Sequence, residues 1–295
     1  MKKILLLMFT VAIVTTVKAQ LHVIKLEKVE IIKNATLIVG TSHDEAVNEA
    51  LYDAVKQFWT IGKVGEPMPL AEAIKKAKED ESIIVITTGT TSSQSLTHED
   101  GAGRYRYIST GHILELFGKS KKAMYKQIIP AFGEDDVITK EILYFGVSAM
   151  HYHLNTMNEK QLGTAKARGE YKIKSPELKK ANLLLAEGWM DSKTTKETVG
   201  DYYTGKCEIV PYETWRNAIL NREPGKAYSI IAPLALGGNY IYYHYLMEAK
   251  TGAVYAIASS KVAVSLRGLN LSKGNSGYIN KKVLDKYSKT LEGKW

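Results

Sequence analysis

The sequence contains the same order of apolar and amphipathic segments twice, and this repetition is the strongest constraint on its fold. The stretches "ATLIVGTSHDEAVNEALYDAVKQFWTIGK" from Ala35 and "ANLLLAEGWMDSKTTKETVGDYYTGK" from Ala181 each predict an apolar strand and then an amphipathic helix that ends at Gly-Lys. A short strand, a second helix and a β-branched strand follow in both copies. Ala35 and Ala181 differ by 146 positions, as do Ile84 and Ile230. The pattern indicates an internal duplication.

The similarity continues beyond these strands at a smaller offset. The segments "STGHILELF" and "KTGAVYAIA" align without a gap at an offset of 141 positions, which pairs Thr110-Gly111 with Thr251-Gly252. The offset falls because the first copy contains a longer loop, "TTSSQSLTHEDGAG". Each copy predicts the order β-α-β-α-β-β-α, so the expected fold class is α/β or α+β, with small mixed sheets and helices packed against them.

The two modules are predicted over residues 35–159 and 180–295. Thr139 and Asn280 precede their closing helices and are residue types that cap helix N-termini. Residues 160–179 are polar and lysine-rich, which is typical of a linker. Residues 20–34 alternate apolar and charged side chains, as an added edge strand would.

The first 19 residues predict a secretory signal peptide. Lys2 and Lys3 precede the apolar run "ILLLMFTVAIVTTV", and Val17 and Ala19 occupy the small-residue positions of a cleavage site. The alternative is a retained membrane anchor, but the run falls short of the ~20 apolar residues that a spanning helix needs. The sequence contains no second long apolar segment, so the mature chain is expected to be exported and soluble, in the periplasm or outside the cell. The "AQ" ending is similar to that of exported proteins of the Bacteroidota.

The charge of the mature chain excludes some partners. Loss of Lys2, Lys3 and Lys18 with the signal peptide lowers the net charge from +9 to +6, and only six of the basic residues are arginine. Because arginine is the usual residue for bidentate phosphate and base contacts, scattered lysine argues against nucleic acid. Weak attraction to anionic envelope polymers remains open.

Short motifs in the sequence do not form a recognisable catalytic site. "GDYYTGK", from Gly200 to Lys206, has the spacing of a phosphate-binding loop, but a strand is predicted after it where that loop requires a helix. Gly205 is better explained as the glycine that ends a helix. Cys207 is the only cysteine, so no intramolecular disulfide forms, and its apolar strand predicts a buried thiol.

Histidine motifs are equally uninformative. "SHDE" at Ser42 has the residue types of a catalytic triad, but adjacent residues cannot adopt its geometry, and Ser42 or Asp44 fits better as a helix cap. His151 and His153 fall in a predicted helix, where a spacing of two separates them by about 200°. We therefore predict no catalytic residue, no metal and no cofactor.

Tyrosines provide the candidate binding residues. In "YIYYHYLME", Tyr240, Tyr242 and His244 would share one face of a strand, either as the inside of a packed hairpin or as an aromatic platform for a sugar or a peptide. Tyr105 and Tyr107 occupy the comparable strand of the first copy. His98 lies in the longer loop of that copy, where function is often added.

The helix-strand-helix units "EALYDAVKQFW…KVGEPMPLAEAIKKA" and "CEIVPYETWRNAIL" resemble the N-terminal domain of TolB and periplasmic activators of peptidoglycan synthases. The resemblance implies an exported, cysteine-poor binding module. The leading hypothesis is a non-enzymatic envelope or secreted protein that binds a protein partner or a cell-surface polymer. Two alternatives stay open: a carbohydrate-binding module that uses the tyrosine face, and an exported hydrolase with dispersed carboxylates at Glu99, Asp100, Glu134 and Asp135.

Overall fold

The computed structural model describes residues 23–90, 95–100, 104–109, 111–120, 122–132, 137–236, 239–259, 265–266, 269–270 and 277–294. The predicted signal peptide lies outside these residues. The α-helices are α2 (Leu26–Asn34), α3 (Glu45–Phe58), α4 (Leu70–Glu79), α5 (Lys140–Lys160), α6 (Thr164–Lys174), α7 (Tyr212–Leu220) and α8 (Lys281–Thr290). Short 3-10 helices are η1 (Ser175–Lys180), η2 (Glu187–Trp189) and η3 (Val199–Asp201).

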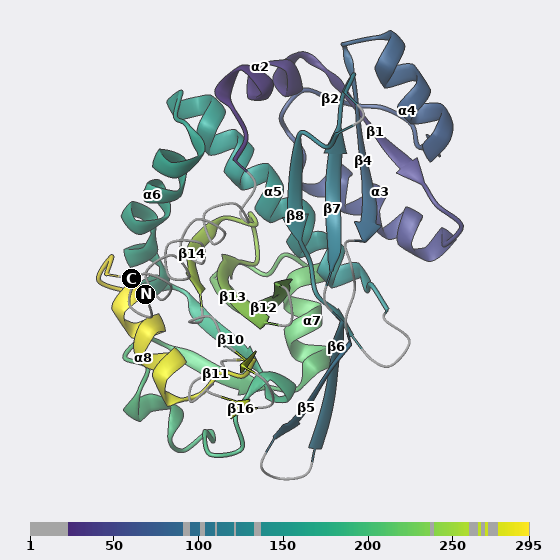
Figure 1. Ribbon diagram of the computed structural model, residues 1–295. Helices are drawn as coiled ribbons and strands as arrows, with labels where there is room; N and C mark the ends of the chain where they lie inside the picture. Colours follow the sequence, from purple (N-terminus) through teal and green to yellow (C-terminus); the bar gives the residue numbers. More distant parts are fainter. Residues whose placement is uncertain are drawn as a thin grey trace, which may run out of the picture.

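Two mixed sheets form the framework (Figure 1). The first has the order β2-β1-β4-β7-β8, and β3 also pairs with β1. Its strands are β1 (Thr36–Thr41), β2 (Lys63–Val64), β3 (Met68–Pro69), β4 (Ile83–Thr90), β7 (His112–Phe117) and β8 (Tyr125–Ile128). The second has the order β11-β10-β12-β13-β14, built from β10 (Asn182–Ala186), β11 (Cys207–Val210), β12 (Lys226–Leu236), β13 (Asn239–Glu248) and β14 (Val254–Ser259).

The two sheets repeat the same pairing directions. β1 is parallel to β2 and β4, and β10 is parallel to β11 and β12. The next two strands of each sheet are antiparallel. The predicted α/β class is thus confirmed, and two similar sheet-helix units fit a duplication.

One part of the predicted alignment is wrong. In the first unit, β5 (Ser95–Asp100) and β6 (Arg104–Ser109) pair in a separate small sheet, and β4 joins β7 in an antiparallel pair that runs from Val85↔Phe117 to Thr90↔His112. Its counterpart in the second unit is the β12-β13 hairpin. Gly111 therefore lies between β6 and β7, directly before the strand that pairs with β4, whereas Gly252 lies in the turn between β13 and β14. Part of the predicted loop is strand β5, whose partner β6 also pairs with β9 (Ala131–Phe132).

Three segments differ from their predicted secondary structure. Residues 26–34 form helix α2 and not an edge strand, because the buried residues Val29 and Ile32 follow a helical spacing of three. Residues 160–179, predicted to be a linker, include α6 and η1, which bury Ala167, Tyr171 and Leu178. The helix predicted between β10 and β11 is absent: η2 and η3 stand there, and Gly205 precedes β11 without ending an α-helix.

The predicted N-cap residues agree with the structure better than these segments do. The side chains of Asp44 and Asn280 accept hydrogen bonds from the backbone N–H groups of Val47 and Val283. Thr139 occupies the N-cap position of α5, but its hydroxyl donates to Glu141 and accepts no capping hydrogen bond from the helix backbone.

Helix α5 lies between the two sheets and belongs to both cores. A β-carbon placed on Gly146 would approach Leu114 and Ile129 of the first unit to 2.6 Å. The ring of Phe145 meets that of Tyr245 edge to face, with 5.0 Å between centroids. Consecutive residues from Glu141 to Met150 are buried, so the helix is covered on all sides.

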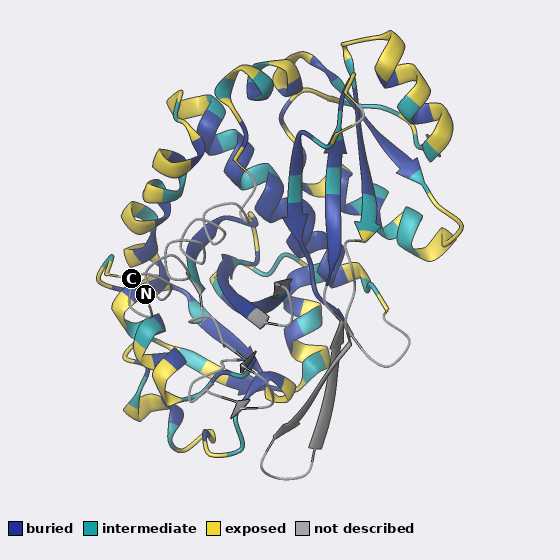
Figure 2. Ribbon diagram, in the orientation of Figure 1, coloured by how far each residue is buried: buried dark blue, intermediate teal, exposed yellow. Residues whose placement is uncertain are grey.

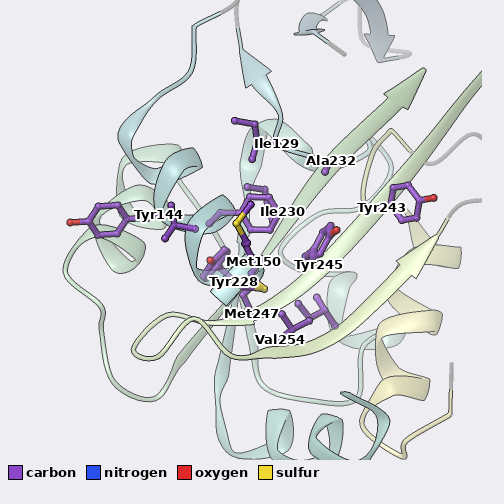
Figure 3. Packing of buried hydrophobic residues seen from close by; sticks show 14 of the residues in the cluster. Ile129, Tyr144, Met150, Tyr228, Ile230, Ala232, Tyr243, Tyr245, Met247 and Val254 are labelled. Atoms are coloured by element: carbon purple, nitrogen blue, oxygen red, sulfur yellow. The ribbon is translucent and has the colours of Figure 1, made fainter. Parts of the chain in front are cut away.

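The resulting apolar core is continuous across the two units. Met150 of α5 lies in the same cluster as Ile230 and Met247 of the second sheet (Figure 3). On the outer face of the first sheet, α4 forms a small separate cluster in which Ala73 and Ala77 contact Ile38 and Val85. Within the described residues, no helix is long and apolar enough to cross a membrane.

The turn at Gly252 tests this packing. Gly252 and Gly225 both have positive φ angles, of 70° and 73°, but only a β-carbon on Gly252 would overlap Ser148 of α5. Gly225→Ala is expected to cost about 1–2 kcal/mol of unfolding free energy from backbone strain alone. Gly252→Ala should cost about 1–3 kcal/mol more because of the overlap, measured by urea denaturation. Equal losses would contradict the close contact of this turn with α5.

Candidate functional site

The carboxyl ends of the parallel strands are the usual ligand sites of open α/β sheets. In the second sheet this position contains Glu141, which comes from the first unit and is fully buried. Its carboxylate accepts hydrogen bonds from the hydroxyl groups of Thr139 and Tyr212, and from Nε of Arg216 at 3.3 Å. Burial, and then the bond to Glu141, raise the pKa of Tyr212. Because only Pro211 separates Tyr212 from the end of β11, Glu141 occupies the place where a ligand would bind.

In the first sheet, strand β3 of the same unit covers the corresponding position, the carboxyl end of β1. β3 pairs with the end of β1 through Gly40↔Met68 and Thr41↔Pro69. A β-carbon on Gly40 would lie 2.6 Å from the side chain of Leu70. The described residues therefore leave little room at either of these two edges.

Arg222 provides a second connection between the units. Its Nε donates to the carbonyl of Lys250 at 2.8 Å, and Nη1 donates to the side-chain oxygen of Gln57 at 3.1 Å. The guanidinium also lies 5.0 Å from the centre of the Phe58 ring. Arg222 adopts a positive φ of 53°, a conformation that these contacts hold in place.

Substitutions at the two carboxylate partners of Arg216 test the role of Glu141. Glu141→Gln should lower the unfolding free energy by about 1–3 kcal/mol, because three part-buried donors lose a charged acceptor that is itself fully buried. Glu213 lies 3.2 Å from the same guanidinium, but its side chain is 68% exposed, so Glu213→Gln should change stability by less than about 0.5 kcal/mol. If chemical denaturation gave similar losses of unfolding free energy for the two variants, the buried carboxylate of Glu141 would contribute no more to stability than the exposed carboxylate of Glu213.

Two residues of the predicted tyrosine face, Tyr242 and His244, have described side chains, and both lie in the core. Tyr242 is 0% exposed and His244 is 2% exposed. Nδ1 of His244 and the hydroxyl of Tyr287 in α8 are 2.8 Å apart. The structure thus favours the packed hairpin for these two residues over an aromatic platform.

The other predicted residues cannot be placed in the same way. The side chains of Tyr240, Tyr105, Tyr107 and His98 lie outside the described part of the structure. So do the side chains of Glu99 and Asp100 and the whole of Glu134 and Asp135. Backbone pairing sets His98 opposite Arg106 and Glu99 opposite Tyr105.

His151 and His153 contact different parts of the protein, as their helical spacing predicts. Nδ1 of His153 lies 2.7 Å from the hydroxyl of Tyr171, and Nε2 of His151 lies 3.0 Å from Oγ1 of Thr60. Burial lowers the pKa of His153 to about 3 and that of His151 to about 4. Among the described residues, no group of three or more potential ligands could hold a metal ion.

These histidines should make stability depend on pH. An unfolded histidine takes up a proton near its ordinary pKa of about 6.5, whereas the folded chain resists protonation until pH 3–4. Unfolding free energy should therefore fall as pH drops below about 6.5, by roughly 1.4 kcal/mol per pH unit for each histidine. The double variant His151→Gln/His153→Gln should flatten thermal stability between about pH 4.5 and 6.5. The exposed control His43→Gln should leave this pH dependence unchanged. If the double variant kept the same dependence of stability on pH, His151 and His153 would not be its cause.

A surface groove of about 550 Å³ lies at the start of β10 and β11. Its lining residues are Asn182, Lys196, Glu197, Val199, Gly200, Gly205, Lys206, Cys207 and Glu208. Strand β11 follows "GDYYTGK", so this segment is not a phosphate-binding loop. Burial raises the pKa of the half-buried Cys207 thiol to about 11, which makes it a poor nucleophile at neutral pH.

Two helical segments elsewhere on the surface carry a clear excess of positive charge. Residues 164–180 contain six basic and two acidic side chains, a net charge of +4, and residues 281–294 contain five basic and two acidic, a net charge of +3. These 31 residues carry +7, so the rest of the mature chain carries −1. We call the exposed lysines of α6, η1 and residues 281–294 the basic face: Lys166, Lys172, Lys179, Lys180, Lys281, Lys282, Lys289 and Lys294.

The two segments of the basic face meet in space. A β-carbon on Gly293 would lie 3.2 Å from the carbonyl oxygen of Lys172. Lys294, and more weakly Lys179, lower the pKa of Glu292. Figure 2 shows exposed residues along α6 and α8, which occupy the same side of the molecule. The sequence prediction missed this face because it counted charge over the whole chain and not by segment.

Comparisons with protein-family models, with curated proteins and with solved structures found no match.

Proposed function

We propose that the protein is an exported, non-enzymatic component of the bacterial envelope that binds an anionic cell-surface polymer through the basic face. The observation that carries this proposal is the concentration of positive charge in two segments that are far apart in sequence and adjacent in space. The signal-peptide pattern at the N-terminus supports export.

The distribution of charge suits an extended ligand better than a compact one. Eight exposed lysines follow three helical elements and do not converge on a single point. Lys289 and Lys294 have carboxylate partners, at 2.7 Å from Asp285 and 2.9 Å from Glu292. Within the described residues, Lys166, Lys180 and Lys282 form no ion pair and remain available to a polyanion. Lysines of this kind act as solvated point charges, so the binding should weaken with salt.

The packing beneath the basic face holds its lysines in position. α6 buries Ala167 and Tyr171 against the core, and α8 buries Val283, Leu284 and Tyr287. Tyr287 contacts His244 of β13, so the histidine of the tyrosine-rich strand supports α8 from inside. Because these helices are fixed in this way, binding should cost little backbone conformational entropy.

Charge reversal on two opposite surfaces tests the proposal. Lys180→Glu/Lys282→Glu in the mature chain should weaken binding to immobilised polygalacturonate about thirtyfold or more at low salt, since each lysine contributes on the order of 1 kcal/mol near an anionic surface. Lys75→Glu/Lys78→Glu introduces the same charge change on exposed positions of α4 and should have much less effect.

Two further measurements complete this test. Binding of the unaltered chain should fall steeply between about 50 and 300 mM salt. Equal weakening by both double variants would overturn the assignment of the face. Tighter binding to phosphatidylglycerol vesicles or duplex DNA than to any acidic polysaccharide would overturn the polymer class.

A further inference from the structure

The groove at the start of β10 and β11 adjoins the basic face. Its lining includes Gly205, which directly follows a segment, residues 202–204, that two hydrogen bonds connect to α8. Oγ of Ser288 donates to the carbonyl of Tyr202 at 2.7 Å and accepts from the N–H of Thr204 at 3.1 Å. Lys281, at the start of α8, lies 4.7 Å from the centre of the Tyr202 ring. A chain that follows α8 would therefore reach the groove.

The groove differs from the basic face in its chemistry. Lys196 and Lys206 provide donors, while Glu197, Glu208 and the amide of Asn182 provide acceptors. Nδ2 of Asn182 donates to Oε1 of Glu208 at 2.8 Å, which orients this carboxylate. A hydrogen bond from the side chain of Thr195, and another from its own backbone N–H, lower the pKa of Glu197, so that side chain is ionised at neutral pH. Sugar hydroxyl groups both donate and accept, and they match a surface that offers both functions.

The floor of the groove is rigid. Tyr203 is 1% exposed and packs directly against Gly205, where a β-carbon would lie 2.8 Å from its ring and hydroxyl. Cys207 and Glu208 belong to strand β11, which is paired with β10 along its whole length. A volume of about 550 Å³ falls in the range of small-molecule sites and exceeds what a single ion requires.

We infer that this groove is the subsite for one repeating unit of the polymer, a carboxylate-bearing sugar. The lysines would pair with the sugar carboxylate, and Glu208 and Asn182 would bind its hydroxyl groups. This inference rests on the proposed function, in which the basic face provides attraction and the groove adds recognition. A bare polyanion with the same charge density would occupy the face without filling the groove.

The alkylation rate of Cys207, which lines the groove, measures whether a ligand occupies the groove. Cys207 is the only thiol that iodoacetamide can alkylate, and Cys207→Ala measures the background reaction at other side chains. The reaction is followed near pH 9 because the thiolate is the reactive form. Oligogalacturonate at ten times its dissociation constant should slow alkylation about tenfold. Dextran sulfate with the same total charge should slow it much less.

A double variant separates recognition from attraction. Lys206→Gln/Glu208→Gln changes two exposed side chains, so the fold should be retained. It should abolish protection of Cys207 while binding to the basic face keeps its dependence on salt. An unchanged alkylation rate on a chain that still binds polygalacturonate would overturn the groove assignment and leave the proposed function intact. Equal protection by dextran sulfate would overturn sugar recognition, and absence of polymer binding at low salt would overturn the proposed function itself.

Discussion

The burial of helix α5 between the two sheets is the constraint on which the rest of the structure depends. Residues 141–150 are buried around the full circumference of the helix, and each side contacts a different unit. Neither unit can therefore complete its core without the other. The apolar cluster extends from α2 to α8, so the two units share one continuous core.

This arrangement also determines where a ligand can bind. The N-terminus of α5 brings Glu141 to the carboxyl end of β11, where Tyr212 and Arg216 hold it. β3 covers the equivalent edge of the first sheet. Within the described residues, α6, η1 and α8 present their lysines away from these two positions, on the outer surface and over a tightly packed base.

Sequence patterns predicted the elements whose determinants are local. Asp44 and Asn280 cap the expected helices, and the alternation of "YIYYHYLME" gives strand β13. The prediction failed where tertiary contacts determine the secondary structure. Residues 26–34 have an alternating pattern, yet Val29 and Ile32 need helical spacing to reach the core. Between β10 and β11, Trp189 and Tyr203 anchor an irregular segment that no helical period describes.

The candidate site was only partly predictable for the same reason. A segment-by-segment charge count identifies residues 164–180 and 281–294, but only the fold shows that they adjoin. The groove depends on a turn held by Ser288, which lies 84 residues after its partner Thr204. The burial of Tyr242 and His244 likewise becomes clear only when α8 is in place.

Hydrogen exchange of the mature chain with and without polygalacturonate tests the central claim most directly. The account predicts slower exchange in residues 164–180, 199–208 and 281–294, with no change in α4 or α2. Slower exchange in α4 and the first sheet, with the basic face unaffected, would contradict it.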